Sequence, residues 1–112
     1  MQAIPKKLLI HEATRYTEEK DRWGNGTPSE EQRLKYVRVE PSSKVVRDKN
    51  NAEVQLAATL FYDCRNSRPR GLTWKTDDVI AINGDKYRVQ TVEPLYDEKR
   101  LHHYEIGMVR YG

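Results

Sequence analysis

Alternation of apolar and polar residues is the dominant pattern along the chain, and it predicts short β-strands in nearly every ordered segment. The clearest case is residues 80–91, IAINGDKYRVQT, in which Asn83 and Gly84 separate two alternating runs. Both central residues of a type I′ turn need positive φ, which Asn and Gly tolerate. The pattern therefore predicts a tight β-hairpin with Asn83-Gly84 at its tip.

The register of this hairpin divides its side chains between two faces. A two-residue loop pairs Ile82 with Asp85 and Ile80 with Tyr87. One face then carries Ile80, Ile82, Tyr87 and Val89. The other face carries Ala81, Lys86, Arg88 and Gln90. We expect the first face in the core and the second in water.

Other segments alternate in the same way and are also predicted to be strands. They are KLLIHEATRY at 7–16, LKYVRVE at 34–40, EVQLAATLFYD at 53–63 and LHHYEIGMVR at 101–110. Residues 7–16 place Leu8, Ile10, Thr14 and Tyr16 at alternate positions. Turns are predicted at 48–51 and 94–99, where Asp, Asn and Pro interrupt the alternation.

Residues 53–63 fit two interpretations. As a strand, in which alternate residues share a face, the segment places Val54, Leu56, Ala58, Leu60 and Tyr62 on one side. Helical spacing joins Val54, Ala57, Ala58 and Phe61, and Asn50 with Glu53 resembles a capping box. The apolar end of the segment and its β-rich surroundings favour one long strand over 53–62.

About six short strands with turns between them predict an all-β fold, a small antiparallel β-barrel or sandwich. The length of 112 residues fits one domain spanning 1–112. Two long loops interrupt the strands, at about 17–33 and 64–76. Loops of such length are usually functional or disordered.

The two loops differ in charge. Residues 17–33 contain five acidic and three basic residues, and also Trp23. We expect this loop to be mobile in the free subunit and ordered in an assembly, with Trp23 packed against a neighbouring chain. Residues 64–76 contain no acid and carry Arg65, Arg68, Arg70, Trp74 and Lys75.

Three interpretations of the basic loop remain open. Its arginines and Trp74 could hold phosphates and stack a base, as in single-strand binders. The loop could also be a solvated surface, or a protein interface, where Arg and Trp are enriched. The net charge of +3 is too small to indicate nucleic-acid binding by itself.

Little in the sequence points to catalysis, metal or cofactor. There is no P-loop and no dinucleotide fingerprint. Cys64, the only cysteine, ends an apolar strand and resembles a small core residue more than a nucleophile paired with a histidine. His102 and His103 are adjacent, so on a strand they would point to opposite faces and could not easily share one ion. Asp77-Asp78 is better interpreted as turn chemistry.

The sequence also predicts neither a signal peptide nor a membrane span. After Lys6 and Lys7 only three apolar residues follow, far fewer than either element needs. The single cysteine excludes an intrachain disulfide.

Several stretches resemble the minor capsid protein family of tailed phages and prophages of Gram-positive bacteria. They are IPKKLLIHEAT, the Trp-Gly-Asn of DRWGNGTPSE, LKYVRVEPSSKVVRDKNN, LFYDCRNSRPRGLTW and NGDKYRVQTVEPLYDEKRLHHYEIG. The resemblance extends from about Ile4 to Gly107, and VEPLYDEKRLHHYEIG is its most specific part. More distantly, this family is similar to head-closure, or stopper, proteins.

The resemblance implies a structural role in the virion, at the head–tail junction, after synthesis in the host bacterial cytoplasm. It implies a cyclic ring that closes the filled head and docks the tail. Portal or adaptor proteins would lie above the ring and the tail terminator or tail tube below, with DNA passing or touching it. The implied interface candidates are Trp23, Arg65, Arg68, Arg70, Trp74 and Lys75. The alternative is a small basic nucleic-acid-binding barrel, and an enzyme ranks third.

Overall fold

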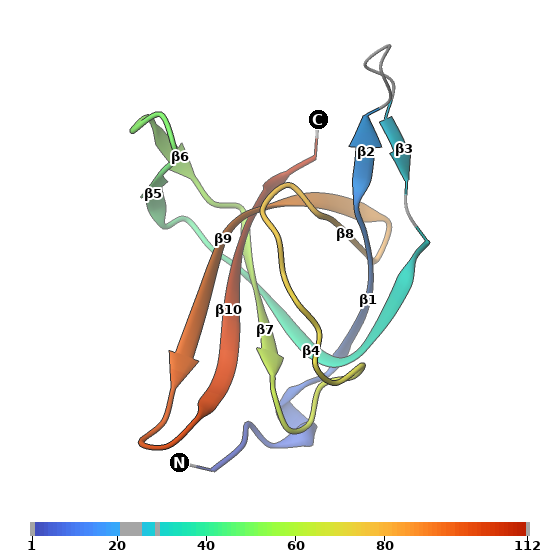
Figure 1. Ribbon diagram of the computed structural model, residues 1–112, viewed down its shortest axis with the longest axis vertical. Helices are drawn as coiled ribbons and strands as arrows, with labels where there is room; N and C mark the ends of the chain where they lie inside the picture. The colour runs from blue at the N-terminus through green and yellow to red at the C-terminus, as the bar shows by residue number, and fades with distance from the viewer. Residues whose placement is uncertain (1, 21–25, 29, 112) are drawn as a thin grey trace.

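A computed structural model of the protein describes residues 2–20, 26–28 and 30–111, and it has six strands closed into an antiparallel barrel. The barrel strands are β1 (His11–Tyr16), β4 (Gln32–Pro41), β7 (Ala58–Asp63), β8 (Val79–Ile82), β9 (Asp85–Tyr96) and β10 (Leu101–Arg110). Around the barrel they run β1-β4-β7-β10-β9-β8, and β8 pairs back with β1 (Figure 1). The predicted all-β fold is confirmed, and it is a barrel.

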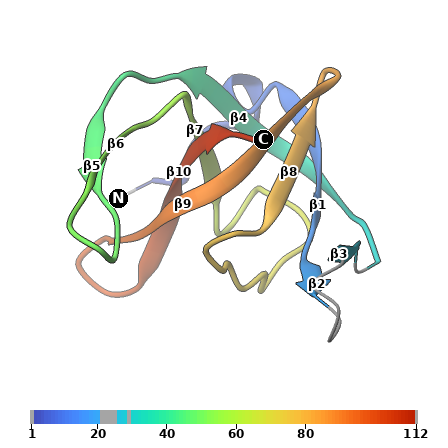
Figure 2. The ribbon, with the colours of Figure 1, turned by 90° about the horizontal axis from the view of Figure 1, so that it is seen from above.

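Two short hairpins extend from the barrel and form separate two-stranded sheets. The first arm pairs β2 (Glu18–Lys20) with β3 (Gly26–Pro28), and the second pairs β5 (Val45–Arg47) with β6 (Glu53–Gln55). Both arms point toward the same end of the barrel but leave it on opposite sides (Figures 1 and 2). The first arm falls within residues 17–33, which were predicted to be a loop. That prediction was wrong at 18–20 and 26–28, which are strands. Trp23 lies outside the described residues.

The 80–91 hairpin has the predicted register. Ile82 pairs with Asp85 and Ile80 with Tyr87. Asn83 has φ 51° and Gly84 has φ 83°, as a type I′ turn requires. All four residues of the predicted core face are buried: Ile80, Ile82, Tyr87 and Val89.

The first predicted strand begins later than the sequence indicated. Residues Lys6–Leu8 form a 3-10 helix, η1, and β1 starts at His11. Leu8 and Ile10 are 46% and 65% exposed, so their expected place on a strand face was wrong. The reason is local hydrogen bonding, because the Leu8 amide donates to the Pro5 carbonyl at 2.9 Å and closes a turn.

Residues 53–62 are extended, as predicted, but they do not form one strand. β6 ends at Gln55 and β7 begins at Ala58. At the break, the Leu56 amide donates to Lys44 and the Ala57 amide donates to Met108, both at 2.8 Å. The chain changes partners here, from the second arm to the barrel, and the strand is interrupted.

The predicted turn at 94–99 is shifted. Pro94 lies within β9, opposite Tyr104 of β10, and the turn follows at 97–100. Here β9 pairs only with β10, because its pairing with β8 ends at Arg88. Proline is tolerated at such a free edge, since no ladder hydrogen bond is lost.

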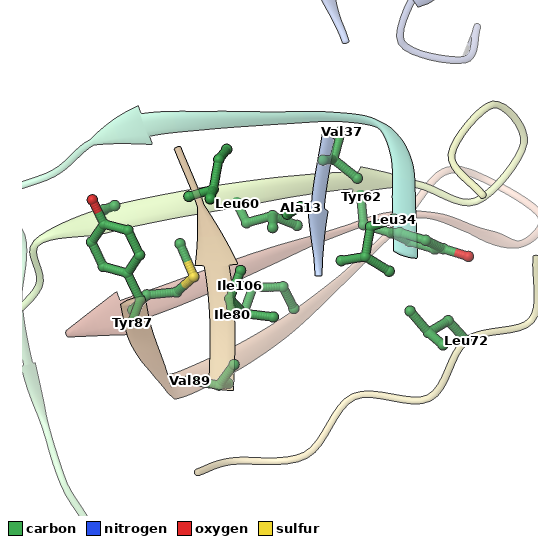
Figure 3. Close-up of a cluster of buried hydrophobic side chains, with 13 residues drawn as sticks. Ala13, Leu34, Val37, Leu60, Tyr62, Leu72, Ile80, Tyr87, Val89 and Ile106 are labelled. Carbon is green, nitrogen blue, oxygen red and sulfur yellow. The ribbon is translucent and has the colours of Figure 1, made fainter. Parts of the chain in front are cut away.

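The core fills the inside of the barrel. Its main members are buried apolar side chains from all six barrel strands and the basic loop (Figure 3). They include Ala13, Leu34, Val37, Leu60, Tyr62, Leu72, Ile80, Tyr87, Val89 and Ile106. Apolar burial of this kind is the dominant favourable term in folding.

Gly107 of β10 is required where three segments meet. It pairs with Thr59 of β7 on one side and Thr91 of β9 on the other. A Cβ at this position would lie 2.8 Å from Leu56 Cδ1 and closer still to Thr91 Oγ1. Glycine allows Leu56 to close the barrel beside the second arm.

We predict that Gly107→Ala lowers the free energy of unfolding by about 1–3 kcal/mol, because the added methyl group overpacks the site. Thermal or denaturant unfolding measures the loss. Adding Thr91→Ala should recover part of it, since the nearest atom is then removed. Unchanged stability in the Gly107→Ala protein would show that the contact relaxes freely.

Candidate functional site

The basic loop, residues 64–76, leaves β7 at one end of the barrel and travels along it toward the start of β8 (Figure 1). It contains no helix or strand, so other contacts must hold it. Buried carboxylates stand just beyond each end of the loop. They are Asp63, which is 0% exposed, and Asp78, which is 1% exposed.

Asp63 joins the loop to the N-terminal segment. Its Oδ1 accepts from the Ile4 amide at 3.0 Å, and its Oδ2 accepts from the amides of Arg65 and Asn66 at 3.1 and 2.8 Å. The Asn66 side chain then donates to the Ile4 carbonyl at 2.7 Å. A buried carboxylate is costly unless it is hydrogen-bonded, so these backbone groups are held in place together.

Asp78 provides the second anchor. Its Oδ1 accepts from the Thr17 hydroxyl at 2.7 Å, and its Oδ2 accepts from the Lys75 amide at 3.3 Å. Arg15 Nη1 lies 3.7 Å from Asp78 Oδ2 and also donates to the Thr73 carbonyl. Burial lowers the pKa of the Arg15 guanidinium, and the Asp78 charge opposes that shift. The sequence predicted Asp78 to be a turn residue; in the structure it also anchors the end of the basic loop to β1.

A bulge in β4 holds the middle of the loop. Three steps along β4, from Leu34 to Val37, match two along β1, and Tyr36 takes φ 56°. The bulge leaves the Lys35 backbone free to pair with Arg68, through hydrogen bonds of 3.0 and 2.9 Å. The buried Ser67 hydroxyl donates to the Tyr36 carbonyl.

The basic side chains of the loop have different roles. Arg68 is committed to the loop itself, because its Nη1 donates to the carbonyls of Arg65 and Ser67 at 2.7 and 2.9 Å. Arg65, Arg70 and Lys75 are exposed. Within the described part of the chain, none of these four cations forms an ion pair.

Trp74 is part of the subunit's own packing. It is partly buried against the core, and its ring meets Tyr62 edge-on with centroids 5.6 Å apart. The Arg15 guanidinium lies 5.3 Å from the centre of its ring. This position argues against Trp74 as an open platform for stacking a base. The role of Arg15 could not be predicted from the sequence, because its place in an alternating strand gives no sign of its contacts with the loop.

The two adjacent histidines meet, contrary to expectation. His102 Nδ1 and His103 Nδ1 lie 2.7 Å apart, because the β9–β10 register shifts between Leu101 and His103. His102 Nε2 donates to the Gln2 carbonyl, and His103 Nε2 lies 3.1 Å from Glu105. Among the described residues, no group of three or more His, Cys, Asp or Glu could hold a metal ion.

Cys64 shows no sign of activation. Burial raises the pKa of its thiol, and the nearby Asp63 charge adds to the rise. In the described part of the chain no hydrogen bond joins the thiol to a histidine; the Cys64 amide donates to the His102 carbonyl at 3.1 Å. A protonated thiol is a poor nucleophile at neutral pH.

The closed barrel, its two arms and the anchored basic loop define a small β-barrel protein. A sequence model described as "Minor capsid protein" matches residues 5–108, so the chain belongs to the minor capsid protein family. It is therefore a phage structural protein located in the virion. No curated protein matches its sequence. No helix in the described residues is long and apolar enough to cross a membrane.

We predict that Asp63→Asn lowers the free energy of unfolding by about 1–3 kcal/mol, because the amide would turn a donor toward backbone donors. Asp97→Asn is the matched control. Asp97 Oδ1 also accepts two backbone amides, from Lys99 and Arg100, but in an exposed turn. Chemical denaturation should show the larger loss for Asp63→Asn; equal losses would contradict the anchoring role.

We predict that Cys64 is alkylated slowly at neutral pH. Its raised pKa keeps the thiol protonated, so the alkylation rate should increase with pH to a midpoint above that of an unstructured cysteine peptide. Iodoacetamide labelling followed by mass spectrometry measures both rates. A midpoint below that of the peptide would indicate an activated thiol instead.

Proposed function

We propose that the protein is a subunit of a head–tail connector ring, a head-completion protein that closes the head and docks the tail. Its membership of the minor capsid protein family supports a virion structural role. The observation that carries the finer proposal is the pair of arms. Each is a two-stranded sheet separate from the barrel, and the two leave the barrel on opposite sides (Figure 2).

An isolated two-stranded hairpin has little stability of its own in water. The second arm also exposes apolar surface, since Val45 is 55% exposed. The barrel strands pair on both sides over much of their length, although β9 has a free edge after Arg88, whereas each arm is a single pair of strands with both outer edges free. The arms are therefore the natural contacts between one subunit and the next.

A closed ring requires a heterologous interface, in which two different patches of each subunit meet. Arms on opposite sides of the barrel supply two such patches. Glu18 of the first arm pairs with Arg88, and the exposed Glu30 and Glu31 follow that arm. In and beside the second arm, Arg47 pairs with Glu53 and Lys44 with Glu93, which leaves the exposed Lys49. Attraction between Glu30 and Glu31 of one subunit and Lys49 of the next would favour head-to-tail pairing over pairing of like arms.

In this arrangement two exposed cations of the basic loop, Arg65 and Arg70, lie beside Ala3 at the end of the barrel opposite the arms. The third, Lys75, lies toward the arms, because the loop crosses the barrel from one end to the other (Figure 1). We propose that the end opposite the arms faces a neighbouring layer of the neck. Portal or adaptor proteins on one side and tail proteins on the other are the proposed partners.

We predict that Val45→Lys weakens ring assembly while leaving thermal unfolding of the subunit unchanged, because the exposed side chain contributes to the interface and not to the core. Native mass spectrometry and electron microscopy, with and without the neighbouring neck proteins, measure assembly. Val45→Ile is the matched control and should assemble as the wild type does. Wild-type protein that stays monomeric even with its neck partners would overturn the ring proposal.

A further inference from the structure

At the barrel end opposite the arms, three arginines surround one cavity of about 260 Å³. Arg65 and Arg70 come from the basic loop, and Arg100 comes from the β9–β10 turn. Arg70 and Arg100 are 30 positions apart in sequence, yet the barrel brings their segments to the same end (Figure 1). His102, Cys64, Leu101 and Ala3 complete much of the wall. The cavity is called the arginine pocket below.

Two acids, Asp63 and Asp97, stand in this wall, but neither acid is bonded to an arginine side chain in the described residues. Asp63 is buried, and both its oxygens accept backbone amides. Asp97 accepts the amides of Lys99 and Arg100; these hydrogen bonds lower the pKa of its carboxyl group, and the Arg100 charge contributes to the lowering. Across the described chain, no ion pair joins either acid to Arg65, Arg70 or Arg100.

The pocket is also held in shape before any ligand arrives. The Arg65 carbonyl accepts from Arg70 Nη2 at 3.3 Å and from Arg68 Nη1 at 2.7 Å. Asp63 fixes the Arg65 amide, and the Asp97 turn fixes the Arg100 amide. Guanidinium groups on a fixed backbone lose less freedom when they bind an anion.

We propose that the arginine pocket binds a phosphate group. A single bidentate guanidinium satisfies a carboxylate, which has two oxygens, whereas a phosphate group offers more oxygens to several arginines at once. The pocket also lies at the end opposite the arms, so it is not the surface assigned above to contacts within the ring. The inference goes beyond the ring and holds whether or not the chain assembles.

The group could be a phosphodiester of nucleic acid or a free phosphate, and binding experiments on the full chain distinguish the two. Titrations with inorganic phosphate and with a short oligothymidylate, followed by NMR of backbone and arginine N–H groups, locate binding. We expect saturable shifts at Arg65, Arg70 and Arg100. Tighter binding of the oligothymidylate, falling steeply with added salt, would identify a phosphodiester; binding of inorganic phosphate alone would identify a free phosphate.

Arg70→Gln and Arg100→Gln should each weaken binding by about tenfold, because each removes one charged donor. Arg47→Gln, an exposed arginine of the second arm, is the matched control and should bind unchanged. The Arg70 side chain also donates a hydrogen bond within its loop, so thermal unfolding must show that Arg70→Gln still folds. The Arg100 side chain forms no hydrogen bond in the described residues, so Arg100→Gln tests the pocket even if Arg70→Gln does not fold.

Three results would overturn the proposal. The first is no saturable binding of either probe. The second is an equal loss in Arg47→Gln, which would indicate attraction to the overall positive charge. The third is saturation by a glutamate-rich peptide but by neither phosphate probe, which would make the pocket a protein interface.

Discussion

The buried carboxylate of Asp63 is the interaction on which one end of the molecule depends. It is the last residue of β7, so the barrel register fixes its position. Its charge must be satisfied there, and the donors within reach are backbone amides of the N-terminal segment and of the basic loop. The same carboxylate therefore gains the hydrogen bonds that it needs and fixes the backbone of the loop. The loop is held in place although it has no regular secondary structure.

Barrel closure imposes the second constraint. Six antiparallel strands pair around the barrel, so their apolar faces point inward and most of their edges are paired, apart from β9 after Arg88. What extends beyond the barrel must be stabilised in another way. The basic loop is anchored by Asp63 and Asp78. In the described residues the two arms are held by their own pairing and by contacts near their bases, such as the Leu56 amide with the Lys44 carbonyl at 2.8 Å and Lys44 with Glu93 at 3.3 Å. The basic loop is therefore a surface fixed by the subunit itself, whereas the arms would gain stability from contact with a partner.

Features with a local cause could be predicted from the sequence. The 80–91 hairpin is the clearest, because turn chemistry at Asn83-Gly84 and alternation on both sides specify tip, register and faces without knowledge of the rest. Features that depend on distant segments could not. The bulge at Tyr36 exposes the Lys35 backbone for pairing with Arg68, which is distant in sequence. The contact between His102 and His103 follows from a register shift in the β9–β10 pairing.

The candidate site shows the same division. Residue types predicted a charged loop at 64–76, but not that Arg68 serves the loop, that Trp74 packs beneath Arg15, or that Arg100 joins Arg65 and Arg70. Each of these depends on the barrel bringing β1 or the β9–β10 turn to the loop. The two arms lie at one end of the long axis (Figure 1), and the second of them exposes Val45. The three arginines of the pocket lie at the other end. A subunit built this way can contact neighbouring subunits of the ring through its arms and hold an anionic ligand at the same time, since the arms do not cover the arginine pocket.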